Sequence, residues 1–480
     1  MNSIDCGLSR VCQSSLVLAV GLLLCPMESR APAIDIEPPA CDKVIHESKE
    51  RRDFSDDRCP KGLRVVQIST DPSMTSHHIY PESHMLTPDS RRFVFHRMGA
   101  DDSSRGAFWL CDIQDDFGIR QLTSEEEAKG PAVSPDGRWM YYFVDKTLAP
   151  EKLLKLKRVS LRTFRRETLL VLNGPIPGTD YRPTRIYPVS SISSDGQRLC
   201  TSAFLGNGKT ESAPFGLLLF DLENPSVKIV FKGSEYCNMH PQYCRSLAPA
   251  PSHDILIQHN HGCLYDRTGS IWKTVPSRGQ PGRKYRLTGK GGADLHVIRD
   301  DGTNWRDVPI ARDGVYTHTG HEQWRGRMQT VISSVTNLTT RKHDLYESWP
   351  IGTDKTTSHK GSNIPGARNN KLTRNVEGTD FNHFSMDISG MHVVARQERQ
   401  HKNDKLTIYI GTFSSGENAF LKVRYLLDTK YVKLGGGRER GQADKPRPFF
   451  SPNARIVFFH SDVDGPSQIF MATGYELPKL

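Results

Sequence analysis

The stretch Val133 to Phe143 reads V-S-P-D-G-R-W-M-Y-Y-F, a Ser-Pro-Asp-Gly turn that runs directly into an aromatic strand. Asp and Gly supply the side-chain hydrogen bond and the positive φ that reverse a chain, and aromatic residues favour strands. The same order recurs at Leu86 to His96 (L-T-P-D-S-R-R-F-V-F-H) and at Phe450 to His460 (F-S-P-N-A-R-I-V-F-F-H). Recurrence so far apart in the chain indicates a repeated architecture.

Weaker copies of this turn and strand fill the space between the clear ones. They lie at Ile192 to Cys200, Ala250 to Ile257, Trp324 to Ile332 and Met386 to Val394. A second strand is expected after most copies, at Phe108 to Ile113, Leu154 to Leu161, Leu217 to Leu222, Leu295 to Ile298, Leu406 to Ile410 and Gln468 to Ala472. The spacing of roughly 50–70 residues suits a four-stranded blade. Because one open sheet of so many strands would expose its edges, the sequence predicts an all-β, seven-bladed β-propeller of four-stranded antiparallel blades over 63–480.

Composition and charge agree with a folded protein that has an anionic partner. The chain has 480 residues, of which 36% are hydrophobic, with 39 Gly and 30 Pro. Long disorder and a helical bundle are therefore disfavoured. The formal net charge of +10 favours an acidic saccharide, anionic lipid or nucleic acid.

The amino terminus has the pattern of an exported protein. An apolar run from Ser14 to Leu24 follows Arg10 and precedes Ala31 and Ala33, which predicts a signal peptide over 1–33. The run is too short to span a bilayer, so we expect a periplasmic or secreted protein without a stable membrane span in the mature chain. Export, and the lack of a continuous basic stripe, also argue against nucleic acid as a partner. Residues 34–62 are rich in Pro and charge and are expected to be a linker that wraps the outside or is mobile.

An oxidising compartment also makes local disulfides plausible. Cys41 with Cys59, and Cys237 with Cys244, are the candidate pairs.

No sequence motif marks a separate catalytic domain. A G-x-S-x-G elbow, a Walker loop and an H-E-x-x-H pattern are all missing from the sequence. Any chemistry must therefore arise from loops of several blades that converge on the propeller axis. Histidines at loop ends are candidates, among them His77, His240, His321 and His383. A loop histidine can equally be a surface or turn-capping residue, but recurrence in several blades raises its functional interest.

Four segments resemble the oligogalacturonate lyases, seven-bladed propellers that cleave short pectin fragments by β-elimination with a manganese ion. The segments are Ser76 to Tyr80 (S-H-H-I-Y), Met239 to Tyr243 (M-H-P-Q-Y), Asp300 to Asn304 (D-D-G-T-N) with Thr319 to Trp324 (T-G-H-E-Q-W), and Phe459 to Gly465 (F-H-S-D-V-D-G). The resemblance extends over most of the chain from about Val65. It implies a lyase acting on an acidic oligosaccharide, with His240 as the base and His321 as a metal ligand.

The expected metal site departs from the family pattern. The family holds its manganese with a Q-x-x-H-x-H-P segment in the last blade, where this chain reads Gln442 to Pro448, Q-A-D-K-P-R-P. Gln442 is kept, but Lys445 and Arg447 stand at two ligand positions, and neither group can ligate a metal at neutral pH.

Three alternatives follow from this departure. A metal is held by His321, Gln442 and His383, with Asp444 as a further candidate ligand; or Lys445 and Arg447 are themselves the cation that pairs with a substrate carboxylate; or activity is lost and the propeller only binds acidic glycans or a protein partner. His77 and Arg325 are further candidates for substrate binding.

Overall fold

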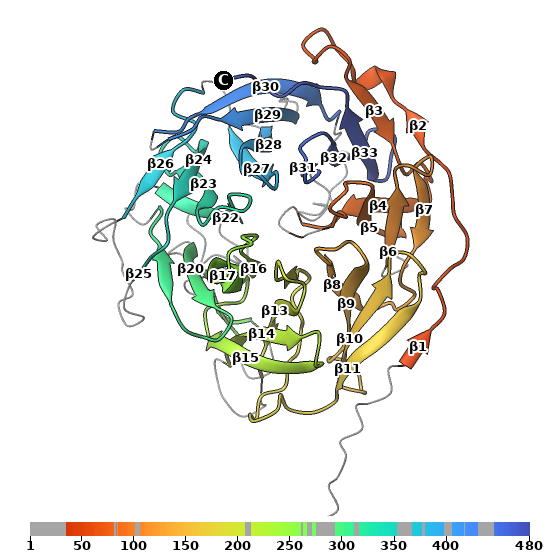
Figure 1. Cartoon of the computed structure of the whole chain (residues 1–480), viewed down its shortest axis with the longest axis vertical. Helices are drawn as coiled ribbons and strands as arrows, with labels where there is room; N and C mark the ends of the chain where they lie inside the picture. The colour runs from red at the N-terminus through yellow and green to blue at the C-terminus, as the bar shows by residue number, and fades with distance from the viewer. Residues whose placement is uncertain are drawn as a thin grey trace, which may run out of the picture. The chain divides into compact units, whose positions relative to one another are not determined.

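The computed structural model describes residues 35–480 apart from 81–82, 84, 101–105, 207–212, 261–262, 266–270, 275–292, 312–315, 353–366, 377–379, 398–405, 417 and 431–445. Seven antiparallel sheets stand radially around one axis, and the first strand of each faces that axis (Figure 1). The seven-bladed β-propeller predicted from the repeats is confirmed. The signal peptide predicted over 1–33 lies outside the described residues. None of the described residues forms a helix long and apolar enough to cross a membrane.

Each blade begins with an inner strand and continues outward. Blades 1 to 3 contain β4 (Met74–His78), β5 (Arg92–Gly99), β6 (Ala107–Asp112) and β7 (Gly118–Gln121); β8 (Ala128–Val133), β9 (Trp139–Lys146), β10 (Leu153–Ser160) and β11 (Arg166–Leu172); and β12 (Ser191–Ile192), β13 (Arg198–Phe204), β14 (Phe215–Asp221) and β15 (Ser226–Gly233). Blades 4 and 5 contain β16 (Gln242–Tyr243), β17 (Asp254–Asn260), β20 (Ala293–Arg299), β21 (Arg306–Val308) and β25 (Ile351–Gly352); and β22 (Tyr316–Trp324), β23 (Val331–Asn337), β24 (His343–Ser348) and β26 (Asn369–Lys371). Blades 6 and 7 contain β27 (Phe381–Met386), β28 (His392–Gln397), β29 (Thr407–Phe413) and β30 (Leu421–Asp428); and β31 (Phe449–Phe450), β32 (Val457–Ser461) and β33 (Gln468–Thr473).

The repeated turns join the first strand of a blade to its second. In blade 2 the Asp136 carboxylate accepts from the Arg138 backbone N–H at 3.0 Å, and Gly137 takes a φ of 69°. Blade 3 repeats the arrangement with Asp195 and Gly196. In blade 7, where the repeat has Ala454 in place of Gly, that residue still takes a φ of 54°. The turn geometry is therefore imposed by the blade even where glycine is absent.

The ring is closed by pairing of the two ends of the chain. Strand β3 (Arg64–Gln67) pairs with β33 and supplies the fourth strand of blade 7, and β2 (Lys49–Glu50) adds a fifth. Strand β1 (Asp35–Glu37) lies on the edge of blade 2, beside β11. The segment predicted as a linker thus contains two strands along the outside of the ring (Figure 1). Blades 2 and 7 gain their fifth strands from this segment and blade 4 gains its fifth from β25, so these three blades have five strands rather than the expected four.

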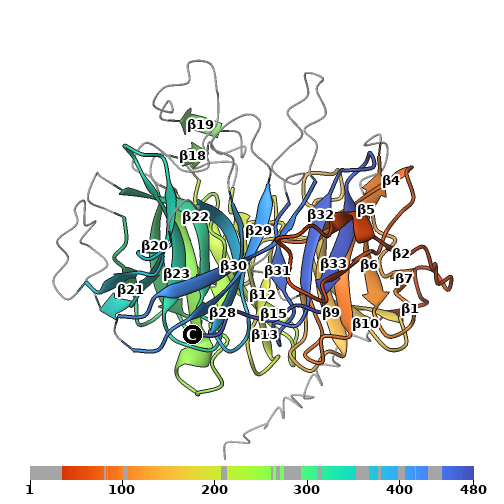
Figure 2. The same cartoon turned by 90° about the horizontal axis from the view of Figure 1, so that it is seen from above.

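The two faces of the ring differ. The hairpin of β18 (Cys263–Tyr265) and β19 (Ile271–Thr274), inserted between β17 and β20, projects beyond one face, which we call the hairpin face (Figure 2). The repeated turns lie at the opposite ends of the inner strands, on what we call the turn face. Between neighbouring blades the core is aromatic and aliphatic, as in the contact of Phe93 with Phe458, whose ring centroids are 4.5 Å apart.

The candidate disulfides are not formed. Cys41 and Cys59 are both free thiols, and Cys59 donates to the Phe54 carbonyl at 3.7 Å. Cys244 is not bonded to Cys237; its thiol lies in the core and donates to the Met328 carbonyl at 3.8 Å, and burial raises its pKa to about 11.

Candidate functional site

One position on the first strand of a blade, or in the segment leading into it, carries an imidazole or a guanidinium group in four consecutive blades. The residue that opens each repeated turn donates its backbone N–H across the turn; in blades 4 to 7 these residues are Cys244, Arg325, Asp387 and Ser451. Four residues before them stand His240, His321, His383 and Arg447. The corresponding residues of blades 1 to 3 are Ser83, Gly130 and Val189. We call this place in the blade the axial position, because the inner strands surround the propeller axis.

The axial position is irregular in the strand. The pairing register shifts there in blades 2, 5 and 6, between Lys129 and Ala132, His318 and Glu322, and Phe381 and His383. Such bulges re-aim side chains that would otherwise alternate between the faces of a sheet. Gly130 has a φ of 55° at this place, and His240 has a φ of 47°. A positive φ at a non-glycine residue costs on the order of 1–3 kcal/mol and is typical of functional sites.

Tyr80, from blade 1, connects the axial residues of three other blades. Its ring centroid lies 5.1 Å from that of His240 and 6.4 Å from that of His321. The Arg447 guanidinium carbon is 4.9 Å from the centre of the same ring. From blade 3, Tyr187 contacts His240 at 5.5 Å between centroids and donates its hydroxyl to Asn238 at 2.7 Å. These contacts bring residues from five blades into one cluster, which we call the axial site.

The tautomers of two axial histidines follow from their hydrogen bonds. His321 Nδ1 is 2.6 Å from the Asn382 side-chain carbonyl, so Nδ1 carries the proton and Nε2 keeps a lone pair. His383 is the reverse case, because Arg396 donates to its Nδ1 at 2.9 Å and a guanidinium can only donate. The proton of the neutral His383 ring is therefore on Nε2. The ring centroids of His321 and His383 are 4.0 Å apart, yet Nε2 of His321 is a hydrogen-bond acceptor and Nε2 of His383 is a donor.

Burial keeps the imidazoles of this region neutral. It is the main cause that lowers the pKa of His240, which Glu322 opposes and Arg447 reinforces. Burial and then the charge of Arg447 place the pKa of His321 well below its usual range. On the hairpin-face side, burial lowers the pKa of His78 to about 4 and that of His318 to about 3. A neutral His240 can accept a proton, and the Glu322 carboxylate would favour the imidazolium that results.

The described residues do not fit a bound manganese ion. A cation site needs several lone-pair donors, and no group of three or more His, Cys, Asp or Glu side chains in the described part of the chain could supply them. His321 Nε2 offers a lone pair, but His383 Nε2 carries a proton. Arg447 adds a positive charge at the equivalent position of the next blade. This set of donors suits an anion, since carboxylates accept from N–H groups and pair with guanidinium.

Other residues singled out in the sequence lie elsewhere. His77 is in β4, where it lies 3.3 Å from His96 between ring nitrogens. Arg325 is buried inside blade 5, 2.7 Å from Glu347, and donates to the Gly390 carbonyl at 2.9 Å. Arg325 thus links blade 5 to the turn of blade 6, and its role as a substrate-binding group stays a prediction. Gln442, Asp444 and Lys445 lie outside the described residues.

Several residues of the site were not predicted from the sequence. Tyr80 lay within a segment that drew attention for its histidines, and only the fold shows its contacts with blades 4, 5 and 7. Arg396 is fully buried, and it donates to the Pro446 carbonyl at 2.9 Å as well as to His383. A charged residue within the apolar run H-V-V-A-R of β28 was the available signal. Glu322 was quoted only as part of a motif, although its side chain is as buried as that of His318, 3.5 Å away.

Comparison with known proteins supports the fold. No protein-family model matches the chain, and no curated protein sequence matches it. A solved oligogalacturonate lyase in complex with manganese is similar over 93% of this chain and 98% of its own, with a TM-score of 0.61 and 17% identity. An oligogalacturonate lyase from Vibrio parahaemolyticus is similar over 92% and 99%, with a TM-score of 0.60 and 16% identity. At these identities the likeness shows a common seven-bladed propeller fold.

Proposed function

We propose that the axial site binds short uronate oligosaccharides and cleaves them by β-elimination, with His240 as the base. The observation that carries this proposal is the convergence of His240, His321, His383 and Arg447 from one position of four blades. The export predicted from the amino terminus belongs to the same proposal, since it would bring the protein to pectin fragments outside the cytoplasm. Nucleic acid is not proposed as a partner.

The elimination needs a base and a cation at defined places. A base removes the proton from the carbon beside the uronate carboxylate, and negative charge then accumulates on that carboxylate. His240, neutral through burial, would take this proton, and Glu322 would stabilise the imidazolium. The bond from the next carbon to the glycosidic oxygen breaks, the leaving oxygen acquires a proton from water, and a carbon–carbon double bond forms in the sugar acid.

Arg447 and the His383 Nε2–H would hold the carboxylate. A guanidinium pairs with a carboxylate through two parallel hydrogen bonds, and these strengthen as the carboxylate gains charge in the transition state. Manganese, which the likeness to the lyase family suggests, would supply the same charge stabilisation. Because the donors among the described residues fit an anion better than a cation, we propose that this chain binds its substrate without a metal.

The experiment is an ultraviolet assay with purified protein and digalacturonate. The unsaturated product absorbs, so turnover appears as a rise in absorbance. We expect His240→Gln to lower the rate by about 10²- to 10⁴-fold, the usual contribution of a general base. Arg455→Met, an exposed arginine of the turn face, serves as the matched control and should leave the rate unchanged. A flat trace for the unaltered protein across pH, with and without manganese, would rule out the lyase.

A second candidate is a non-catalytic propeller that binds acidic glycans. The observation that favours it is the same depression of the pKa of His240, because an imidazole that resists protonation is a weaker base. Titration calorimetry with digalacturonate separates the two functions. Binding with an unchanged absorbance, weakened by Arg447→Met but not by His240→Gln, identifies a binding protein.

A further inference from the structure

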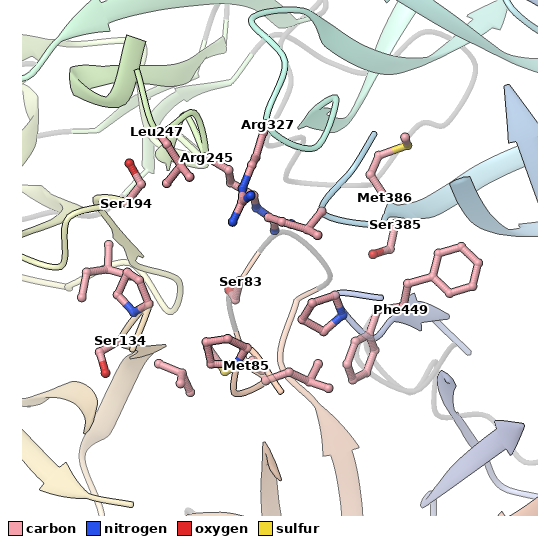
Figure 3. A pocket seen from close by; sticks show the side chains of 18 residues that line it. Ser83, Met85, Ser134, Ser194, Arg245, Leu247, Arg327, Ser385, Met386 and Phe449 are labelled. Carbon is pink, nitrogen blue, oxygen red and sulfur yellow. The ribbon is translucent and has the colours of Figure 1, made fainter. Parts of the chain in front are cut away.

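A cavity of about 210 Å³ opens on the turn face, and side chains from all seven blades line it. Figure 3 shows it with Ser83 near the centre and Arg245 and Arg327 beside one another. Ser83 occupies the axial position of blade 1, whereas the other lining residues come later in their strands or in the turns. None of the axial-site residues His240, His321, His383, Arg447, Tyr80 and Tyr187 lines this cavity. We call this space the turn-face cavity.

The turn-face cavity contains two arginines that the fold does not use. Arg245 lies in the turn after β16, next to Cys244, and Arg327 lies in the turn after β22. Within the described part of the chain, neither guanidinium forms an ion pair or a hydrogen bond. By contrast, the guanidinium of Arg325, two residues before Arg327, is paired with Glu347. Two unpaired guanidinium groups on one small cavity repel one another, and an anion between them would relieve that repulsion.

The local charge sets the valence of that anion. Asp387 is the carboxylate that acts on Arg245, but it accepts hydrogen bonds from the backbone N–H groups of Ser389 and His392 in its own turn. Burial lowers the pKa of Arg245 to about 10, so its charge is poorly solvated. Among the described residues, the two guanidinium groups and the Asp387 carboxylate leave one net positive charge. A monoanion neutralises this charge, whereas a phosphate dianion would exceed it.

The remainder of the lining is mainly apolar. It includes Met85, Met386 and Phe449, which are buried, and Leu247, which is 65% exposed at the rim. A ligand that covers this leucine removes apolar surface from water, which stabilises the complex by about 25 cal/mol per Å². The buried Ser83 hydroxyl has no hydrogen-bond partner among the described residues and provides an additional donor. The lining therefore fits a ligand with one charged end and an apolar body.

We propose that the turn-face cavity binds a small carboxylate with an apolar body, its carboxylate held by Arg245 and Arg327 and its body packed on Leu247. This site is separate from the axial site and does not depend on the proposed function. The charge and the apolar lining together distinguish the ligand from a sugar acid, whose hydroxyl groups would have to give up water against the apolar lining.

The test is isothermal titration of the full chain with benzoate as the probe. We expect one benzoate to bind, and benzamide and acetate to bind at least about tenfold more weakly, because each lacks one half of the recognised chemistry. Arg245→Met and Arg327→Met should each weaken benzoate at least about tenfold, the usual effect of a hydrogen bond to a charged group. Leu247→Asn should weaken benzoate while leaving acetate unchanged. Arg455→Met, on the same face, is the control.

Several results would overturn the proposal. One is the absence of any heat of binding for benzoate, and another is equal binding of benzamide and benzoate. A third is an unchanged benzoate affinity in Arg327→Met; because Arg327 is exposed, this variant should fold even if Arg245→Met does not. Loss of benzoate binding in His240→Gln would place the ligand in the axial site instead and would equally overturn it. Because that variant tests the axial site separately, failure of the lyase assay and failure of this proposal are distinguishable.

Discussion

Acid should destabilise this propeller well above the pH at which its carboxylates protonate. Burial lowers the pKa of His78 to about 4 and that of His318 to about 3, and their residues are only 6% and 3% exposed. In the unfolded chain both imidazoles take up a proton near pH 6.5. The unfolded state therefore binds more protons than the folded state below that pH, and the free energy of unfolding rises with pH. The stabilisation is fully present above about pH 6.5 and is lost as pH falls toward the folded-state pKa values.

The magnitude follows from the pKa shifts. At pH 5.0 the contribution of each of the two histidines to the free energy of unfolding has fallen by about 2 kcal/mol. This pH lies about 1.5 units below 6.5, and each unit corresponds to about 1.4 kcal/mol. Together they remove about 4 kcal/mol, a large share of the about 5–15 kcal/mol that usually holds a protein folded. His240, His321 and His460, whose pKa values are also lowered mainly by burial, act in the same direction.

Urea denaturation followed by tryptophan fluorescence between pH 7.5 and 5.0 measures the effect. Carboxylates such as Asp53, whose pKa is lowered chiefly by its hydrogen bond from Arg51, lose their contribution mostly below this window. His318→Gln should reduce the slope of unfolding free energy against pH by about 1.4 kcal/mol per unit near pH 5.5. His46→Gln removes an exposed histidine and should leave the slope unchanged. Equal slopes for His318→Gln and the unaltered protein would refute the reasoning.

Three further predictions concern the blades and the metal. Arg325→Met should lower the free energy of unfolding by about 3–5 kcal/mol in urea, because it leaves Glu347 charged and buried, and adding Glu347→Leu should recover most of the loss. Gly326→Ala should destabilise far more than Gly178→Ala: both glycines have positive φ, but an added Cβ would lie 2.3 Å from the Gly390 nitrogen in the first case and in open space in the second. Similar melting temperatures for the two alanine variants would contradict this. Digalacturonate affinity should be the same with EDTA and with manganese in calorimetry, and a clear gain with manganese would restore the metal-dependent alternative.

The amino-acid sequence by itself determined the number of blades and the position of each turn. Local chemistry suffices for this, because a residue such as Asp136 binds the backbone two positions on and Gly137 adopts a positive φ without strain. The strands after the turns were also predictable from alternating apolar residues. Closure of the ring was not, since β3 joins β33 through backbone pairing between segments at opposite ends of the chain, which no local pattern records.

Only the tertiary structure decided which polar residues meet. His240, His321, His383 and Arg447 were each visible in the sequence, yet their common place four residues before a turn required the register of every inner strand. Arg325 looked as available as Arg327, and only packing pairs the first with Glu347 and leaves the second on a cavity. The donor role of His383 likewise depends on Arg396, its register partner on the adjacent strand β28. Turns are determined by interactions between residues a few positions apart in the sequence. A site on the axis instead depends on long-range pairing that brings distant strands into register.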